Sequence, residues 1–460
     1  MSERSAGSRP RRADRPRTGV SVLRRMRNDR RTIFGWAMYD WANSAFVVVA
    51  VGILPAYFGS YIVPEQGWMG LSAESLWGYM VGLISLALFL ITPVLGAIAD
   101  YSARRLFFLR AFAYGGAVFA TCFAFVSTGA VVAAILVFLA SHFGLAAANV
   151  FYDGILPLIT TDDTIDRVSS KGYALGYIGG GIYLLFAMGF IFYSDTLGVD
   201  EALAARLAIG GTGVWWSAFS WYAFRRLREV GAARGTPVAG PRESRFLAYL
   251  RLGFKRTWRT CVSLSGHKHL LLFVIAYMFY IDGVQTVISI SAIYASETLE
   301  ISTAFIALVL LVVQFMAFFG ALLFGRLSDR IGPKRSISLA LVAWTGVLVF
   351  AYYLPVGQNY PLLAVGMVIG MVMGGTQALS RSVYGSIIPE QASAQFFGFF
   401  AVFTKFSAIW GPIIFATFRE VTGSSRPAVL SLVSFFVVGL ILLSFVDIQK
   451  ARDRRSEWIV

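Results

Sequence analysis

Charged residues, cysteines and histidines are all scarce in this chain. Only 14% of its 460 residues are charged, whereas soluble domains carry about 25%. The 2 cysteines and 3 histidines are too few for a disulfide framework, and their spacing matches no metal-ligand motif. The phosphate-binding loop GxxxxGK[ST] does not occur in the sequence either. These absences argue against a soluble enzyme, against ATP hydrolysis and against a resident metal or other cofactor.

Apolar residues, by contrast, are abundant and lie in long runs. They make up 57% of the chain, and the mean hydropathy is +0.67. A run of about 18 or more apolar residues is long enough to cross a hydrocarbon core of roughly 30 Å as a helix. Twelve such runs predict an all-α membrane protein with twelve transmembrane helices, at residues 34–60, 76–99, 106–127, 129–152, 172–193, 203–224, 270–295, 302–325, 337–355, 361–385, 396–418 and 427–447.

The net charge of +15 is explained by where the basic residues lie. They gather in alternate connecting segments, namely residues 1–33, Arg104 with Arg105, residues 225–268, Arg330 with Arg335, and residues 452–455. By the positive-inside rule, both termini are expected in the cytoplasm. We expect a multi-pass protein of the cell (inner) membrane, whose basic segments face lipid headgroups rather than nucleic acid.

The long polar segment at residues 225–268 divides the twelve runs into two sets of six. It contains the stretch GAARGTPVAGPRESR, whose Gly, Pro and Arg content is typical of a linker. Transporter folds are often built from internal repeats. We therefore expect two pseudo-symmetric six-helix bundles and two basic tails, with the chain divided into residues 1–33, 34–224, 225–268, 269–448 and 449–460.

Two short patterns recur in both halves. One is an acid, an amide and a hydroxyl on one helical face, present as Asp40, Asn43 and Ser44 and again as Asp282, Gln285 and Thr286. The other is a glycine and an aspartate before a basic pair, present as GAIADYSARR at residues 96–105 and as GRLSDRIGPKR at residues 325–335.

The second pattern, found after spans two and eight, resembles the signature loop of the major facilitator superfamily. A closer resemblance is to the autophagy-related vacuolar amino-acid effluxer family and its bacterial relatives. It rests on WAMYDWANSAF, FYDGILPLI, DRVSSKGYALGYIGGG, GGTQALSRSVYGSIIPE and FFGFFAVFTKFSAIWGP. The resemblance implies the major facilitator fold and transport by alternating access.

The resemblance also implies a gate on the cytoplasmic side. In the superfamily, the loop aspartate pairs with basic residues or helix ends and holds the gate closed. Asp100 is expected to act with Arg104 and Arg105, and Asp329 with Arg330 and Arg335. The same motifs contain Gly96, Gly325, Gly332 and Lys334. The alternative is that these charges only anchor the loops on the cytoplasmic side.

Ionisable side chains inside the predicted spans are costly and usually face the bundle interior. Spans one, four, seven and ten line the cavity in the superfamily, which implies a substrate or proton site formed by Asp40, Asn43, Asp282, Gln285, Gln377 and Arg381, with Lys405 as a further basic group. Asp40 either titrates a proton, binds a cationic group or tethers helices. Arg381 either holds a substrate carboxylate or forms a permanent ion pair with Asp153 or Asp282. Asp153 could instead belong to the gate or the surface.

We interpret the chain as a secondary active transporter rather than an enzyme. We expect it to work as a monomer and to move a small polar solute, such as an amino acid or similar metabolite, with proton coupling and in the direction of efflux. The alternatives are a facilitative uniporter or a carrier of another solute, such as a drug, a sugar or an organic ion. A membrane-embedded lipid-modifying enzyme and a non-transporting receptor remain as other classes.

Overall fold

The computed structural model describes residues 27–229, 244–407 and 409–458, and its elements are helices joined by loops. The first half contains α2 (Arg30–Gly52), α3 (Leu54–Tyr57), α4 (Ala73–Ser102), α5 (Arg105–Cys122), α6 (Val131–Ile159), α7 (Ile165–Phe192) and α8 (Glu201–Phe224). The second half contains α10 (Lys268–Ile293), α11 (Thr303–Ile331), α12 (Pro333–Tyr352), α13 (Asn359–Ile387), α14 (Ser393–Ser407), α15 (Trp410–Thr422), α16 (Ser425–Ser431) and α17 (Val433–Ser444). The expected all-α architecture is confirmed.

Most of these helices can span a membrane. In the described ranges, ten helices are long and apolar enough, and the pair formed by α2 and the residues Leu54–Ile62, bent by 47°, gives an eleventh. The twelfth expected span is α8, which is less apolar, although its 24 residues suffice for about 30 Å of hydrocarbon. Trp216 of α8 stacks on Phe46 of α2 with 5.9 Å between ring centroids, so α8 packs into the bundle.

The expected span at residues 396–418 is covered by α14 and α15, which together form one candidate span over Glu390–Thr422. α14 ends at Ser407 and α15 begins at Trp410. Pro412 lies in the first turn of α15, where a proline is tolerated because the backbone N–H there has no partner within the helix.

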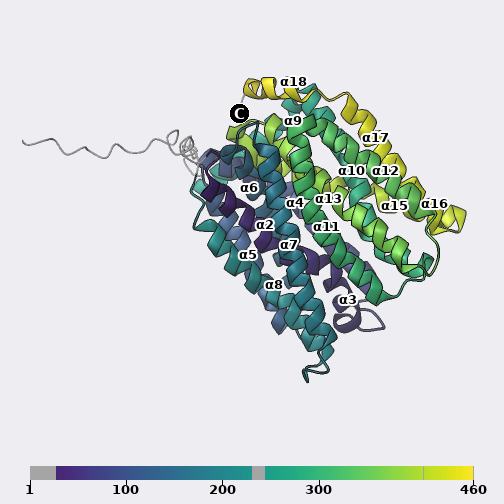
Figure 1. Cartoon of the computed structure of the whole chain (residues 1–460). Coiled ribbons are helices and arrows are strands. Elements are labelled where there is room, and N and C mark those ends of the chain that lie inside the picture. Colours follow the sequence, from purple (N-terminus) through teal and green to yellow (C-terminus); the bar gives the residue numbers. More distant parts are fainter. Residues whose placement is uncertain (1–26, 230–243, 408, 459–460) are drawn as a thin grey trace, which may run out of the picture.

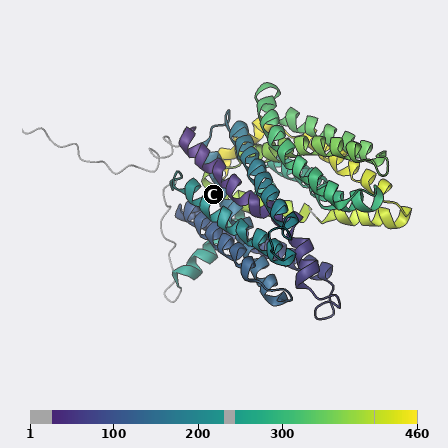
Figure 2. The same cartoon turned by 60° about the horizontal axis from the view of Figure 1, so that its bottom comes forward.

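The hydrophobic core forms two clusters that follow the two halves of the chain. One consists mainly of side chains from α2 to α8 and the other mainly of side chains from α10 to α17. In the second cluster, Trp344 stacks on Phe436 with 5.3 Å between ring centroids. Both views show the purple-to-teal half beside the green-to-yellow half (Figure 1, Figure 2).

The two halves are in close contact on the side where α2 begins and α18 (Ile448–Asp453) lies, at the top of Figure 1. We call this side the terminal side. A Cβ atom on Gly96 of α4 would collide with the backbone of Ala394 in α14, and one on Gly325 of α11 would lie 2.6 Å from Ser170 Oγ in α7. Glycines at both positions let the helices approach closely, and the terminal side is closed.

Parts of the expected linker and tails are folded. The segment 225–268 contains the helix α9 (Arg245–Leu264), and α18 opens the C-terminal tail. Residues 1–26, which make up most of the expected N-terminal tail, and residues 230–243, which hold most of GAARGTPVAGPRESR, lie outside the described residues.

Candidate functional site

Arg381 of α13 lies at the centre of a buried cluster of charges. Its Nη1 atom is 3.1 Å from Asp40 Oδ2 and 3.2 Å from Asp153 Oδ1. Asp40 belongs to α2 and Asp153 to α6, so the cluster joins two helices of the first half to one helix of the second. The Arg381 side chain is 3% exposed, compared with 13% for Asp40 and 21% for Asp153. Solvent therefore reaches the carboxylates more easily than the guanidinium group.

The Arg381 guanidinium group is held by Ser169 and by aromatic rings. Nε donates to Ser169 Oγ at 3.0 Å, and Nη2 donates to the Ser169 carbonyl oxygen at 2.9 Å. The Cζ atom lies 4.1 Å from the ring centroid of Tyr173 and 4.9 Å from that of Trp36, which is within the range of cation–π attraction. The fork geometry of arginine makes these contacts possible together, and a lysine ammonium could not replace them.

The two carboxylates of the cluster carry one more charge than Arg381 neutralises. The Tyr152 hydroxyl donates to Asp40 Oδ2 at 2.7 Å, which offsets part of the excess. Buried charges in proteins are paired or protonated. The cluster can therefore become neutral in two ways, by taking up a proton on one carboxylate or by binding a cationic group of a ligand.

Asn43 and Gln377 lie one helical turn from Asp40 and Arg381 in their own helices, but they bind other partners. Asn43 Nδ2 donates to Asn149 Oδ1 at 3.2 Å. Gln377 Oε1 accepts from the Tyr177 hydroxyl at 2.8 Å. Tyr177 belongs to α7 and Gln377 to α13, so this bond also connects the two halves.

Among the described residues, Asp282 is paired with a backbone N–H group and Arg381 with Asp40 and Asp153. The Asp282 carboxylate accepts from the Gly411 backbone N–H, at 3.0 Å to Oδ1 and 3.1 Å to Oδ2. Gly411 is the second residue of α15, and the first N–H groups of a helix have no partner within it. A negative charge is also favourable at a helix N-terminus. The start of α15 therefore gives Asp282 a partner of its own.

The repeated pattern of an acid and a hydroxyl nevertheless packs against a similar neighbour in both halves. A Cβ atom on Gly411 would collide with Thr286 Oγ1, beside Asp282, and one on Gly176 would lie 2.8 Å from Ser44 Oγ, one turn after Asp40. In each half the polar face of the repeat thus packs against a glycine.

Gln285 and Lys405 complete the expected site residues. Both are partly buried. Gln285 lies in α10 and Lys405 in α14. Neither residue belongs to the Arg381 cluster as the structure describes it.

Asp100, at the end of α4, forms the first contact of the expected gate. It makes an ion pair with Arg105, and both side chains are buried. Its carboxylate also accepts from the backbone N–H groups of Gln395 at 2.8 Å and Ala394 at 3.3 Å. These residues begin α14, so an aspartate of the first half caps a helix of the second half. Arg105 donates to two carbonyl oxygens just before α14.

Asp329, at the end of α11, makes the corresponding contact from the second half to the first half. It accepts from Arg167 of α7, at 2.6 Å from Nη2 and 3.2 Å from Nε. The expected partners Arg330 and Arg335 are exposed, and the ion pair of Asp329 in the described residues is with Arg167. The reason is that α4 and α11 are equivalent in the two halves, as are α7 and α14. Each aspartate therefore reaches the start of the fifth span of the opposite half.

The remaining residues of the two loop motifs have structural positions. Gly332 ends α11 with a φ of +85°, which lies in the region that favours glycine. Lys334 donates to the carbonyl oxygens of Ser444 and Val446 at 2.6 and 2.7 Å. Arg104 is exposed at the start of α5.

Sequence reasoning did not single out Ser169, Tyr173 or Arg167. All three lie in DRVSSKGYALGYIGGG, at the start of α7. A hydroxyl, an aromatic ring and an arginine in the first turns of one transmembrane helix were the available signal.

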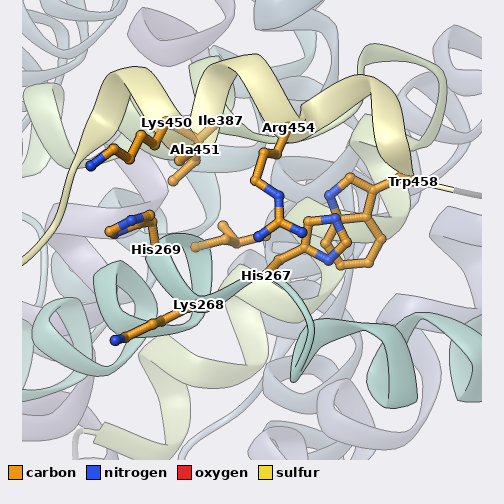
Figure 3. Close-up of a pocket in the computed structure, with 9 residues that line it drawn as sticks. His267, Lys268, His269, Ile387, Lys450, Ala451, Arg454 and Trp458 are labelled. Atoms are coloured by element: carbon orange, nitrogen blue, oxygen red, sulfur yellow. The ribbon is translucent and has the colours of Figure 1, made fainter.

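A small basic pocket lies on the terminal side, between the start of α10 and the C-terminal residues. It is lined by nine residues that include Lys268, Lys450 and Arg454, and the Trp458 ring stacks on His267 with 3.8 Å between centroids (Figure 3). Its volume is about 10 Å³, which is roughly the space of one water molecule. This pocket is too small for a metabolite, and it is formed where the C-terminal segment packs on the second half.

The sequence and the fold both match known transporters. The family model described as "Vacuole effluxer Atg22 like" matches residues 28–456. The "Uncharacterized MFS-type transporter YxiO" of Bacillus subtilis is 31% identical over 421 residues, which cover 91% of this chain and 95% of that protein. "Autophagy-related protein 22-1" of Aspergillus fumigatus is 27% identical over 62% of this chain, and the match spans 49% of its own length.

Solved structures of major facilitator transporters share the fold. FucP in its outward conformation has a TM-score of 0.66 at 13% identity, over 91% of this chain and 98% of its own. The proton:xylose symporter XylE has a TM-score of 0.63 at 14% identity, over 93% of this chain and 97% of its own. The match of the family model over almost the whole chain, on this fold, shows that the chain belongs to the Atg22-like effluxer family and is a secondary transporter of the major facilitator superfamily.

Proposed function

We propose that the protein exports an amino acid, or a similar small zwitterionic metabolite, by alternating access coupled to protons. The observation that carries this proposal is the sharing of Arg381 by Asp40 and Asp153 across the boundary between the halves. The family description as an effluxer supports the direction.

A zwitterion offers both charges that this cluster can exchange. In the proposed cycle, the substrate carboxylate takes the place of an aspartate on the Arg381 fork, because planar bidentate recognition of carboxylates is what arginine does best. The substrate ammonium group then pairs with the aspartate that is released. Protonation of that aspartate likewise removes its ion pair with Arg381. Either exchange weakens a bond between the halves and permits their rocking motion.

We further propose that the terminal side faces the cytoplasm, that the chain lies in the cell membrane and that it works as a monomer. The exposed residues Arg104, Arg330 and Arg335 lie on the terminal side, whereas Glu65 and Glu297 lie in segments on the opposite side. This distribution follows the positive-inside rule.

Counterflow of labelled amino acids in proteoliposomes tests the proposed function, with and without an imposed pH gradient. We expect flux that responds to the gradient in the wild type. In Asp40→Asn we expect flux to fall about tenfold or more and to lose its response to the gradient, since removing a proton-transfer group typically costs about 10²-fold or more. Asp282→Asn is the matched control, because an asparagine oxygen can still accept from Gly411, and it should keep both flux and response.

Each other outcome has a definite meaning. Flux that is indifferent both to the gradient and to Asp40→Asn contradicts proton coupling and indicates a facilitative uniporter. If no amino acid exchanges while another class of solute does, the proposed substrate class is wrong.

A second prediction concerns Gly172 of α7. A Cβ atom there would lie 2.7 Å from Asp40 Oδ2 and 2.8 Å from Arg381 Nη2. Gly172→Ala is therefore expected to lower counterflow about tenfold, because small displacements of binding groups cost one to two orders of magnitude. Gly189→Ala is the control in the same helix, where a Cβ would meet nothing within 4 Å. Equal fluxes of the two variants, per amount of folded protein, would refute the proposed role of the cluster's geometry.

A further inference from the structure

The helix α9 is packed against the transporter on one face. A Cβ atom on Gly253 would lie 2.8 Å from Val94 Cγ1 and 3.1 Å from Ile98 Cγ1, both in α4. The Thr260 hydroxyl accepts from Gln395 Nε2 of α14 at 2.8 Å. α9 is thus fixed to one helix of each half.

A second face of α9 is apolar and open. Leu247, Phe254 and Trp258 follow one another at intervals of seven and four residues, which aligns them in one stripe along a helix, and the exposed Arg251 lies on the same face between Leu247 and Phe254. Phe254 is 60% exposed and Trp258 72% exposed. Large aromatic side chains in such a stripe mark a contact with an apolar partner.

A third face of α9 is basic. Lys255 and Arg259 are exposed, and a spacing of four residues puts them on the same side of the helix. Each follows directly after an aromatic residue of the stripe, so it is turned from the stripe by about 100° around the helix axis. The positive charges therefore lie along one edge of the aromatic stripe.

α9 packs close to the end of α4 on the terminal side. Ile98 and Val94 lie four and eight residues before the end of α4 at Ser102, which is about 6 and 12 Å at 1.5 Å per residue. Figure 1 shows α9 at the same end of the molecule as α18. Amphipathic helices in a bilayer surface lie with their apolar face about 5–10 Å into the boundary between headgroups and acyl chains.

We propose that α9 docks on the anionic phospholipids of the leaflet on the terminal side. Phe254 and Trp258 enter the boundary with the acyl chains, and Lys255 and Arg259 bind the headgroup phosphates. Charge complementarity favours this partner, because a purely apolar partner would not account for the basic face.

The chain offers a reporter for this contact in Cys261. It is exposed and lies seven residues after Phe254, close to the same stripe. In a Cys122→Ala background, a fluorophore on Cys261 would be quenched by lipids that carry a nitroxide on the acyl chain. The full chain is reconstituted in vesicles of phosphatidylcholine with or without phosphatidylglycerol. We expect quenching that is at least about twofold stronger when phosphatidylglycerol is present.

Separate variants test the contribution of the basic face of α9 and that of its aromatic stripe. Lys255→Gln with Arg259→Gln should remove the effect of phosphatidylglycerol. Arg30→Gln with Arg31→Gln, which neutralises two exposed residues at the start of α2, is the matched control and should keep it. Phe254→Ser with Trp258→Ser should lower quenching in both kinds of vesicle.

Three results would overturn the proposal. Quenching that is the same in both vesicles and unchanged by Lys255→Gln with Arg259→Gln would exclude anionic lipid as the partner. Quenching by aqueous iodide alone would show that the stripe faces water. Cross-linking of Cys261 between two chains would show that a second copy covers the stripe.

Discussion

Arg381→Gln is expected to lower counterflow at least about a hundredfold and to reduce the yield of folded protein. The substitution leaves the carboxylates of Asp40 and Asp153, which lie 3.1 and 3.2 Å from Nη1, without their cation. Removing one partner of a buried ion pair costs about 3–5 kcal/mol, and every 1.4 kcal/mol is a factor of about ten in an equilibrium constant. Flux in proteoliposomes, normalised to folded protein by size-exclusion chromatography, and the midpoint of thermal unfolding are the measurements.

A double variant distinguishes a role in transport from a role in packing. Arg381→Gln with Asp153→Asn removes the cation together with one carboxylate and leaves Asp40 with its hydrogen bond from Tyr152. We expect this protein to recover thermal stability and still not to transport, because the substrate carboxylate has lost its partner. Recovery of transport together with stability would make Arg381 a structural ion pair and would refute its proposed role. Arg381→Lys should be only partly active, since one ammonium group cannot replace the bonds to Ser169 and both aspartates.

Much of the architecture follows from the length of the apolar runs. A helix that crosses a bilayer satisfies its own backbone hydrogen bonds, so run length alone predicts most spans without any knowledge of their neighbours. The start of α15 within the eleventh span was harder to foresee, because the residues around it are apolar. Its local signal is Gly411 followed by Pro412, which is typical of a helix start.

The partners of the buried charges were less predictable than their presence. The cost of burying charge identified Asp40, Asp282 and Arg381 as residues that need partners, but it does not say which partner each has. Asp282 binds the start of α15, and the sequence signal for that helix start does not tell which carboxylate it meets. Asp153 binds Arg381, although its place near a helix end was equally compatible with a gate or a surface position.

The loop motifs show the same limit. Their spacing predicted Asp100 and Asp329 as equivalent residues, and the structure confirms neither the expected partners of Asp329 nor an equal environment for the two. Asp100 is buried with Arg105, whereas the side chains of Arg167 and Asp329 are 58% and 27% exposed. Burial depends on how the two halves pack against each other, and it determines how strongly each contact stabilises the closed gate.

From this difference we expect Asp100→Asn to open the terminal side far more than Asp329→Asn. Asparagine keeps the shape of Asp100 but leaves the buried Arg105 without a counter-charge and weakens the cap on α14. The cost is about 3 kcal/mol or more, which shifts the equilibrium between closed and open gates about a hundredfold. The exposed pair of Asp329 and Arg167 is worth about 0.2–1 kcal/mol, which corresponds to less than about a sixfold shift.

Ser170→Cys, in a background without the two native cysteines, reports on the opening. Ser170 is 1% exposed and packs against Gly325 between α7 and α11, so a maleimide that cannot cross the membrane reacts only when the halves part. We expect the reaction to be about a hundredfold faster with Asp100→Asn and less than about sixfold faster with Asp329→Asn. Ser170 lies one turn from Arg167 in α7, so any local disturbance favours a large effect of Asp329→Asn. A faster reaction with Asp100→Asn than with Asp329→Asn would therefore be the stronger evidence for the buried contact, whereas equal rates with the wild type and Asp100→Asn would contradict its role in holding the gate.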